Sequence, residues 1–315
     1  MTSRTWFAVA VACGTALLSA QAADRLATEI ARVATAAAEV LPEDSRAAIG
    51  SRLERAKTAA AAGQTWLALY DLQVGYEGEA GYRLASTRNT VPDHAAFTRK
   101  WTEMGAPADP PATKARVLFV GALAQSAEGR APATYKASLP YAQDAGLEAG
   151  LYYLGESHAM VRFASFCRSL DLKAPGRWPS LRSIEPELAA YEKQVVKAYD
   201  AAPASQRPQY AGVNVAIKLA RTLDEQKRYE GALLQYLVSR YRYAILNAAR
   251  QQPPPVNELK TRLANTKPST ETDHSIAEFF TQLAQAALSG PQPAPASAAA
   301  ILDDILPAYS VVAKK

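Results

Sequence analysis

Three histidines are the residues of this chain best suited to metal binding or acid–base chemistry. His94 and His274 each follow an aspartate at an expected helix start, where solvent exposure is usual. His158 lies in an apolar stretch two residues after Glu156, a spacing that points the two side chains apart on a helix. The sequence contains no HExxH motif and no Cys/His ligand spacing. The histidine pattern therefore predicts no metal site.

The nucleophile signatures of common enzymes are also missing from the sequence. No Gly-x-Ser-x-Gly motif occurs, and Ser157 falls in a predicted helix with no strand before it. Glu77 and Glu79 form the acidic cluster that best suits an acid–base enzyme. We expect no catalytic residue and no cofactor, and we lean against an enzyme. The alternative is an all-α enzyme that acts in a cavity between helices on an envelope-derived substrate.

Tyrosine and arginine are concentrated between residues 213 and 247, and both residue types are over-represented at binding hot spots. Three of these tyrosines recur every seven residues, which places them near one face of a helix. The candidate binding residues are Arg221, Arg228, Tyr229, Tyr236, Arg240 and Tyr243. Tyrosines at helical spacing are also typical of a packed core, so packing is the competing interpretation.

The charge of the chain points to the chemistry of a partner. The net charge is +5, and basic residues exceed acidic ones by five between residues 205 and 250 alone. A local basic surplus favours anionic partners. The sequence thus predicts a scaffold or binding module for a protein segment or an anionic envelope component.

The elements that position these residues are expected to be helices. Alanine dominates the apolar residues, with runs at 34–38 and 58–62, and alanine has the highest helix propensity. Alternating β-branched runs and Asn-Gly or Asp-Gly turns between apolar stretches are missing. We predict an all-α fold of stacked antiparallel helical hairpins, an irregular α-solenoid.

The clearest hairpin covers residues 213–247 and turns at 225–228. We predict a second turn at 128–130, between helices over 113–127 and 133–145, and an apolar helix over 147–170. The glycines at 75, 78 and 81 indicate either a weak helix end or a close helix contact. Asp273 is the expected N-cap of a helix that ends at Ser289.

The hairpin at 213–243 resembles a tetratricopeptide repeat. It has apolar residues at Ala216, Leu219 and Leu223, and small residues at Ala220 and Ala232, twelve apart, where the resemblance implies that two helices cross. Gly121 and Ala133 repeat that spacing, and Val117-x-x-Val120-Gly121 and Leu151-x-x-Leu154-Gly155 lie 34 residues apart, the period of this family. The closing proline of the repeat is absent after Tyr236. The resemblance implies a helical array that binds proteins.

The amino terminus indicates export. Arg4, an apolar run over 6–18 and Ala20-Gln21-Ala22 follow the pattern of a secretory signal peptide, and the apolar run is shorter than the roughly 20 residues of a spanning helix. We predict cleavage after Ala22 and a periplasmic or secreted protein with no transmembrane segment after cleavage. Export argues against nucleic acid as the physiological partner. Cys167 is then the remaining cysteine, expected as buried core filler.

The breaks in the pattern divide the chain into four parts. The predicted parts are a signal peptide over 1–22, N-terminal helical hairpins over 23–104, a central helical array over 112–250, and C-terminal helices with a proline-rich linker over 256–315.

Overall fold

The computed structural model describes residues 20–108, 115–172, 176–248, 252–266, 272–290 and 292–313. Over these residues the protein is all-α, as predicted, and its sole β feature is an isolated bridge between Arg177 and Thr272. The α-helices are α1 (Ala20–Val40), α2 (Glu43–Ala61), α3 (Thr65–Ala85), α4 (His94–Met104), α5 (Leu118–Asp144), α6 (Leu147–Ser169), α7 (Glu185–Ala201), α8 (Ala211–Glu225), α9 (Tyr229–Ala248), α10 (Val256–Ala264), α11 (Ser275–Ser289), α12 (Pro295–Ala300) and α13 (Leu306–Ala313). Short 3₁₀ turns η1 (Ser86–Thr90) and η2 (Arg207–Tyr210) and a π-helical turn η3 (Ile301–Ile305) join some of them.

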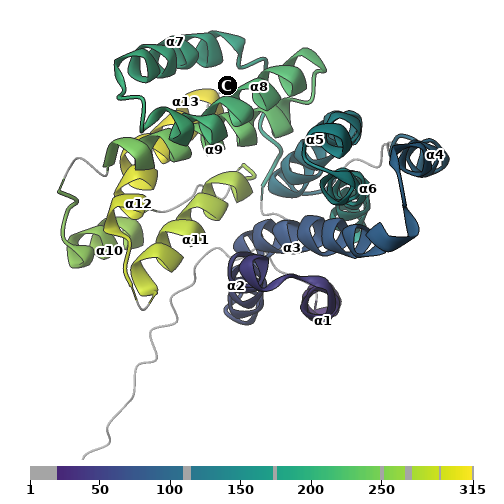
Figure 1. The fold of residues 1–315 in the computed structure, drawn as a ribbon. Helices are drawn as coiled ribbons and strands as arrows, with labels where there is room; N and C mark the ends of the chain where they lie inside the picture. Colours follow the sequence, from purple (N-terminus) through teal and green to yellow (C-terminus); the bar gives the residue numbers. More distant parts are fainter. Residues whose placement is uncertain are drawn as a thin grey trace, which may run out of the picture.

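The helices pack in neighbouring pairs around a shared core (Figure 1). Helices α1 to α6 form one half of the molecule, and α7 to α13 form the other. The two halves meet where α5 packs against α8 and α9. One hydrophobic cluster contains buried residues from Ala22 in α1 to Val312 in α13. The hairpin-like contacts are therefore present, whereas the resemblance to tetratricopeptide repeats and the four predicted parts stay predictions.

The predicted hairpin at 213–247 is confirmed, but the predicted turn at 128–130 is wrong. Helices α8 and α9 meet at Gln226–Arg228, where Lys227 has a φ of 60°. In contrast, α5 runs through 128–130 without a break and contains both Pro132 and Pro140. The physical reason is packing: a Cβ at Gly129 would lie 2.7 Å from Leu223 of α8, so glycine marks a close helix contact there.

The glycine-rich stretch of α3 is likewise a close helix contact and not a frayed end. A Cβ at Gly78 would lie 2.5 Å from Ile49 of α2, and one at Gly81 would lie 2.6 Å from Tyr152 of α6. From the other side, a Cβ at Gly155 would lie 2.4 Å from the backbone oxygen of Ala80. Small residues let α3 approach both neighbours, and this approach buries the polar side chains that α3 carries between its glycines.

The start of α5 is completed by residues far away in the sequence. The Leu118 amide donates to Oδ2 of Asp273 at 2.6 Å, and the Phe119 amide donates to Oγ of Ser275 at 2.9 Å. Asp273 was predicted to be the N-cap of its own helix, but α11 begins at Ser275 and its N-cap is His274. The Asp273 Oδ1 nevertheless accepts the Ser275 amide at 2.9 Å. Its other oxygen, however, satisfies one of the amides that every helix leaves free at its start. The carboxylate therefore ties α11 to α5.

Three other helices follow the same arrangement. In α3 and α7 the N-cap side chain makes no capping hydrogen bond. In all three helices an amide at the N-terminal end donates to a side chain of another helix. The amide–acceptor pairs are Leu67 with Gln282 at 3.0 Å for α3, Ile184 with Asp224 at 2.9 Å for α7, and Gly231 with Gln125 at 2.9 Å for α9. Tertiary contacts thus supply hydrogen bonds that a local Ser, Thr, Asp or Asn side chain usually provides at a helix start.

One helical stretch, Pro295–Ala313, is long and apolar enough to cross a membrane by length and composition. No such segment was predicted after the signal peptide. In the structure Ile305 and Tyr309 of this stretch are buried in the core. Asp304 of the same stretch forms an ion pair with Arg240 of α9. These contacts are those of a helix packed inside a folded protein.

The predicted signal peptide falls almost entirely on residues 1–19, which lie outside the described residues. Helix α1 begins at Ala20 and contains the predicted cleavage point, and Ala22 is 2% exposed within the core. Cleavage after Ala22 stays a prediction. A cut there would shorten α1 by three residues and leave its apolar stripe from Leu26 onward in place.

Candidate functional site

The residues predicted to bind a partner through α9 are mostly engaged inside the fold. The Arg240 guanidinium pairs with Asp304 and lies 5.2 Å from the ring centre of Tyr191 and 5.5 Å from that of Tyr236. It also donates to the Tyr236 hydroxyl at 2.8 Å. Tyr236 and Tyr243 are buried, and burial raises the pKa of Tyr236. This group joins α7, α9 and η3.

The other predicted binding residues point to different neighbours. Arg221 forms an ion pair with Glu192 of α7 at 2.6 Å, and Arg228 lies 3.7 Å from Glu128 of α5. Tyr229 is half-buried at the start of α9. The structure therefore brings Tyr236, Tyr243 and Arg240 together around Tyr191, and it spreads the remaining three over other contacts.

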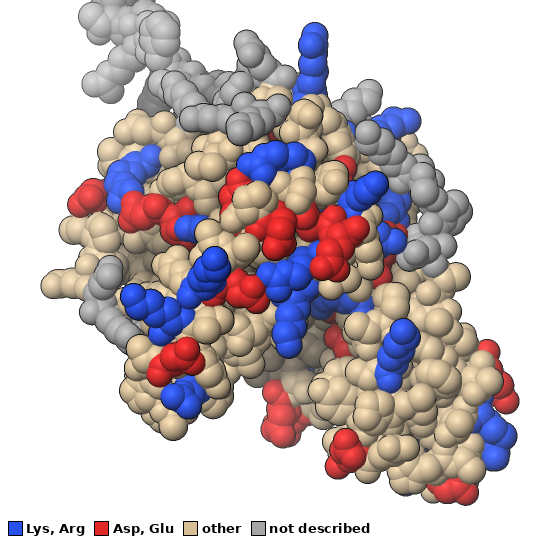
Figure 2. All heavy atoms as spheres, turned by 90° about the horizontal axis from the view of Figure 1, so that it is seen from above, with Lys and Arg blue, Asp and Glu red and all other residues tan. Residues whose placement is uncertain are grey.

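Acidic and basic side chains alternate over the face of the molecule seen from above, where no large area of one sign stands out (Figure 2). Ion pairs contribute to this alternation, because three arginines of the hairpin, Arg221, Arg228 and Arg240, each have a carboxylate nearby. A local surplus in the sequence does not become a basic surface when acidic residues from other helices fold against it.

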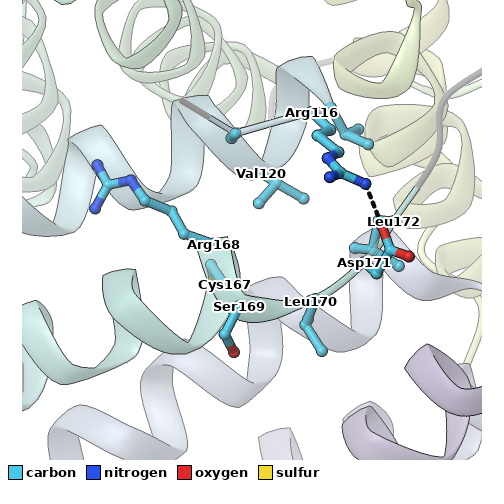
Figure 3. A pocket seen from close by; sticks show the side chains of 10 residues that line it. Arg116, Val120, Cys167, Arg168, Ser169, Leu170, Asp171 and Leu172 are labelled. Atoms are coloured by element: carbon cyan, nitrogen blue, oxygen red, sulfur yellow. Dashed lines mark hydrogen bonds and ion pairs between the residues drawn. The ribbon is translucent and has the colours of Figure 1, made fainter. Parts of the chain in front are cut away.

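A cavity of about 240 Å³ lies between the start of α5 and the end of α6 (Figure 3). Its three charged lining residues in the described part are all engaged: Arg116 pairs with Asp171 at 2.6 Å, and Arg168 extends away from that pair to Glu128. The Cys167 thiol is fully buried, and burial raises its pKa, so it stays protonated and unreactive. The cavity thus offers no free charged group for chemistry.

A more unusual group of polar side chains lies where α3, α5 and α6 meet. The Glu77 carboxylate on α3 accepts a hydrogen bond from Gln73 at 2.8 Å and forms an ion pair with Arg130 of α5. The Glu77 side chain is 10% exposed and that of Arg130 is 30% exposed. Two donors hold this carboxylate in place, and Arg130 keeps a path to solvent.

Glu156 of α6 faces the same group and has no partner of its own. No hydrogen bond or ion pair to its carboxyl occurs among the described residues. Burial, and then the charge of Glu77, raise the pKa of Glu156 to about 7, although the Arg130 charge opposes the shift. Near neutral pH, Glu156 can therefore hold or release a proton while Glu77 remains paired with Arg130. Carboxyl groups in such different settings are typical of functional sites.

Four tyrosine rings contact one another in sequence beside this part of α6, and we call them the tyrosine face: Tyr82, Tyr141, Tyr152 and Tyr153. The Tyr152 ring lies edge-on to Tyr82 at 4.9 Å and to Tyr153 at 5.4 Å, with interplanar angles of 67° and 90°. Tyr141 stacks on Tyr153 at 4.1 Å and is 41% exposed. The other three rings are half-buried. The Glu156 charge raises the pKa of both Tyr152 and Tyr153, after the effect of burial, which places the carboxyl beside these rings.

The described residues contain no group of three or more His, Cys, Asp or Glu side chains able to hold a metal ion. His158 packs edge-on to Tyr135, and burial lowers its pKa. Its Nε2 atom is buried without a hydrogen-bond partner in the described structure. His94 contacts the backbone oxygen of Ala142 at 3.0 Å.

Sequence reasoning singled out Glu77 but missed Arg130, Glu156 and the tyrosine face. A signal was present, because Tyr152 and Tyr153 precede Glu156 by four and three residues and so share its side of a helix. Glu77, Tyr82 and Arg130 lie on other helices, so no spacing in the sequence linked them to Glu156. In comparisons with known proteins, no family model, no curated protein and no solved structure matches this chain.

Proposed function

We propose that the protein is an exported helical binding module that recognises its partner through the tyrosine face. The observation that carries this proposal is the group of four mutually packed tyrosine rings, one of them 41% exposed, two of which lie on α6 one turn before Glu156. Tyrosine combines a large contact area with a polar end and little conformational freedom to lose, which is why it dominates binding surfaces.

The position of this surface in the fold also supports a role in binding. Its rings are carried by α3, α5 and α6, whose mutual packing is fixed by glycines such as Gly81 and Gly155. Sites on rigid helices lose little freedom when a partner binds. Arg221, Arg228 and Arg240 of the hairpin at 213–247, in contrast, are paired with carboxylates of other elements. The proposal therefore keeps the predicted function and assigns it to a different surface.

A second candidate function is an enzyme that uses Glu156 as a general acid or base. The specific observation is the contrast between Glu77, which is paired with Arg130, and Glu156, whose pKa is raised to about 7. A group with a pKa near the working pH is well suited to proton transfer. Loss of turnover of an envelope-derived substrate in a Glu156→Gln variant, with an unchanged set of partners, favours this alternative.

Cross-linking in cells followed by mass spectrometry tests the binding function without assuming a ligand. The informative variant is Tyr141→Leu combined with Tyr153→Leu, which removes two adjacent rings and keeps apolar side chains in their place. The matched control is Tyr199→Leu on α7, a half-buried tyrosine whose ring is covered by the Arg207 guanidinium. We expect the double variant to lose its cross-linked partners and the control to keep them. Equal partner sets in both variants contradict the proposal.

A further inference from the structure

We infer that His158 makes the docking of α4 sensitive to acid, so that protonation of its ring releases α4 from α5 and α6. This release needs no partner, and it therefore goes beyond the proposed binding function. It gives a role to a buried titratable group that the binding function does not use.

Helix α4 is attached to the fold separately from the main core. Its buried side chain, Phe97, belongs to a small hydrophobic cluster of its own. The other buried members of that cluster are Val91, Ala142, Leu147 and Leu151. A helix held by a small satellite cluster opens more easily than one in the main core, because few buried apolar contacts resist its release.

The carboxyl end of α4 rests on Tyr135 of α5. The Trp101 ring stacks on the Tyr135 ring with their centres 4.4 Å apart and an interplanar angle of 16°. The Trp101 Nε1 atom donates to the backbone oxygen of Tyr135 at 3.2 Å, and the Tyr135 hydroxyl donates to the backbone oxygen of Trp101 at 3.0 Å. The position of Tyr135 therefore decides whether this end of α4 stays docked.

His158 supports the same Tyr135 ring from α6. The two ring centres lie 6.4 Å apart with an interplanar angle of 81°. The His158 Nε2 atom is buried, and it has no hydrogen-bond partner among the described residues. A neutral imidazole can leave one nitrogen as an unpaired acceptor, whereas an imidazolium carries a donor on both nitrogens and a full charge. Protonation therefore costs free energy while α4 is docked, and burial accordingly lowers the pKa of His158.

The charged and titratable groups around His158 do not offset this cost. Arg162 lies one turn further along α6, and its positive charge also lowers the pKa of His158. Glu156, two residues before it on α6, points to another side of the helix. The group from α5 is Tyr135, whose hydroxyl is already bonded to α4. The carboxylate at the end of α4, Glu103, is exposed.

Acid should therefore shift α4 from the docked to the released state. A released His158 binds a proton with the affinity of an ordinary histidine, whereas the docked one has a lowered pKa and binds it less readily. Docking is thus fully stable above about pH 6.5 and weakens as the pH falls below that value. Between about pH 7.5 and about pH 5.5 the released fraction should rise about three- to tenfold. Release uncovers apolar side chains such as Phe97 and Leu151, so the two states present different surfaces.

Hydrogen–deuterium exchange of the full chain, followed by mass spectrometry at about pH 7.5 and about pH 5.5, tests the inference. The rates are corrected for the intrinsic pH dependence of amide exchange, and peptides of α9 serve as the internal reference. We expect the amides of α4 to exchange about three- to tenfold faster at the lower pH after this correction. Those of α9 should change by less than about twofold, because α9 lies in the main core.

Two variants and two matched controls connect the response to His158. His158→Phe keeps an aromatic ring against Tyr135 but cannot titrate, and His158→Gln is a smaller neutral replacement; both should abolish the acid response of α4. His94→Gln, which replaces the other histidine that α4 carries against α5, should keep the response. Glu156→Gln should also keep it, because protonation of Glu156 stabilises the fold and so has the opposite sign. Circular dichroism confirms that each variant is folded.

The inference is wrong if the corrected exchange of α4 is the same at both pH values, or if every helix loses protection to the same extent. It is also wrong if either His158 variant keeps the acid response, or if His94→Gln abolishes it. None of these outcomes bears on the proposed binding function, which is tested by the partners of the Tyr141 and Tyr153 double variant.

Discussion

Replacement of Asp273 by alanine is expected to destabilise the protein far more than the loss of an ordinary helix cap. Asp273 is fully buried, and its two carboxylate oxygens accept from the amides of Leu118 and Ser275 and from the Ser275 hydroxyl at 2.6 Å. In the alanine variant both amides lose their acceptor in a place that water does not reach. A buried donor without a partner costs about 1–3 kcal/mol, so two of them cost about 2–6 kcal/mol.

Asp93 provides the matched comparison. It caps α4 locally by accepting from the Ala96 amide at 2.8 Å, and it is exposed. Water can replace its carboxylate, so Asp93→Ala should cost about 1 kcal/mol. Thermal unfolding followed by circular dichroism separates the two cases. At about 2 °C per kcal/mol for a chain of this size, Asp273→Ala should lower Tm by about 4–12 °C and Asp93→Ala by about 2 °C.

Asp273→Asn refines the comparison. The asparagine keeps one oxygen for Ser275 but turns an NH₂ group toward the Leu118 amide, so donor faces donor. Its Tm should fall between those of the original chain and Asp273→Ala. If Asp273→Ala costs no more than Asp93→Ala, the idea that a distant carboxylate completes α5 is refuted, because the buried amides would then have found other partners.

Three further predictions follow from buried groups. Because the pKa of Glu156 is raised from 4.5 to about 7 in the folded state, its protonation stabilises the fold fully below about pH 4.5, and this stabilisation is lost as the pH rises through about 7. The free energy of unfolding in urea should therefore fall between about pH 5 and about pH 8.5 by about 2 kcal/mol more in the original chain than in Glu156→Gln. Gly155→Ala should destabilise the protein by about 1–3 kcal/mol, because the new Cβ would meet the backbone of Ala80. Gly50→Ala in α2 has no neighbour within 4 Å and should stabilise the protein by about 0.5–1 kcal/mol. Equal effects of the two substitutions in thermal unfolding contradict the packing argument. Cys167, fully buried with a raised pKa, should react with a maleimide only after unfolding, and rapid labelling of the folded chain would show that α6 opens.

Part of the site could be recognised from the sequence, and part could not. Glu77 stood out because it forms an acidic cluster with Glu79 in a glycine-rich stretch, and the structure shows it buried beside Gln73 and Arg130. Its significance depends on Arg130 and Glu156, which lie 53 and 79 residues further along on other helices. The raised pKa of Glu156 and the charge balance among these side chains arise only when the three helices pack.

The hairpin at 213–247 shows the opposite case. Its helices and turn were predicted correctly, because apolar spacing and a polar turn are local properties. Its tyrosines and arginines were assigned to a surface, but Asp304 and Tyr191 from distant segments enclose Arg240, Tyr236 and Tyr243. A count of local charges cannot include carboxylates that arrive from elsewhere in the chain.

The sequence by itself determined that this protein is built from helices and where most of those helices lie, because alanine content, apolar periodicity and missing strand signals act over one or two turns. The tertiary structure alone decided how the helices begin and which polar groups face each other. Helices α3, α5, α7 and α9 each receive an acceptor at their N-terminal end from a distant segment of the chain. The physical reason is that every helix leaves its first amides free, and a folded chain can satisfy them with any acceptor that packing delivers.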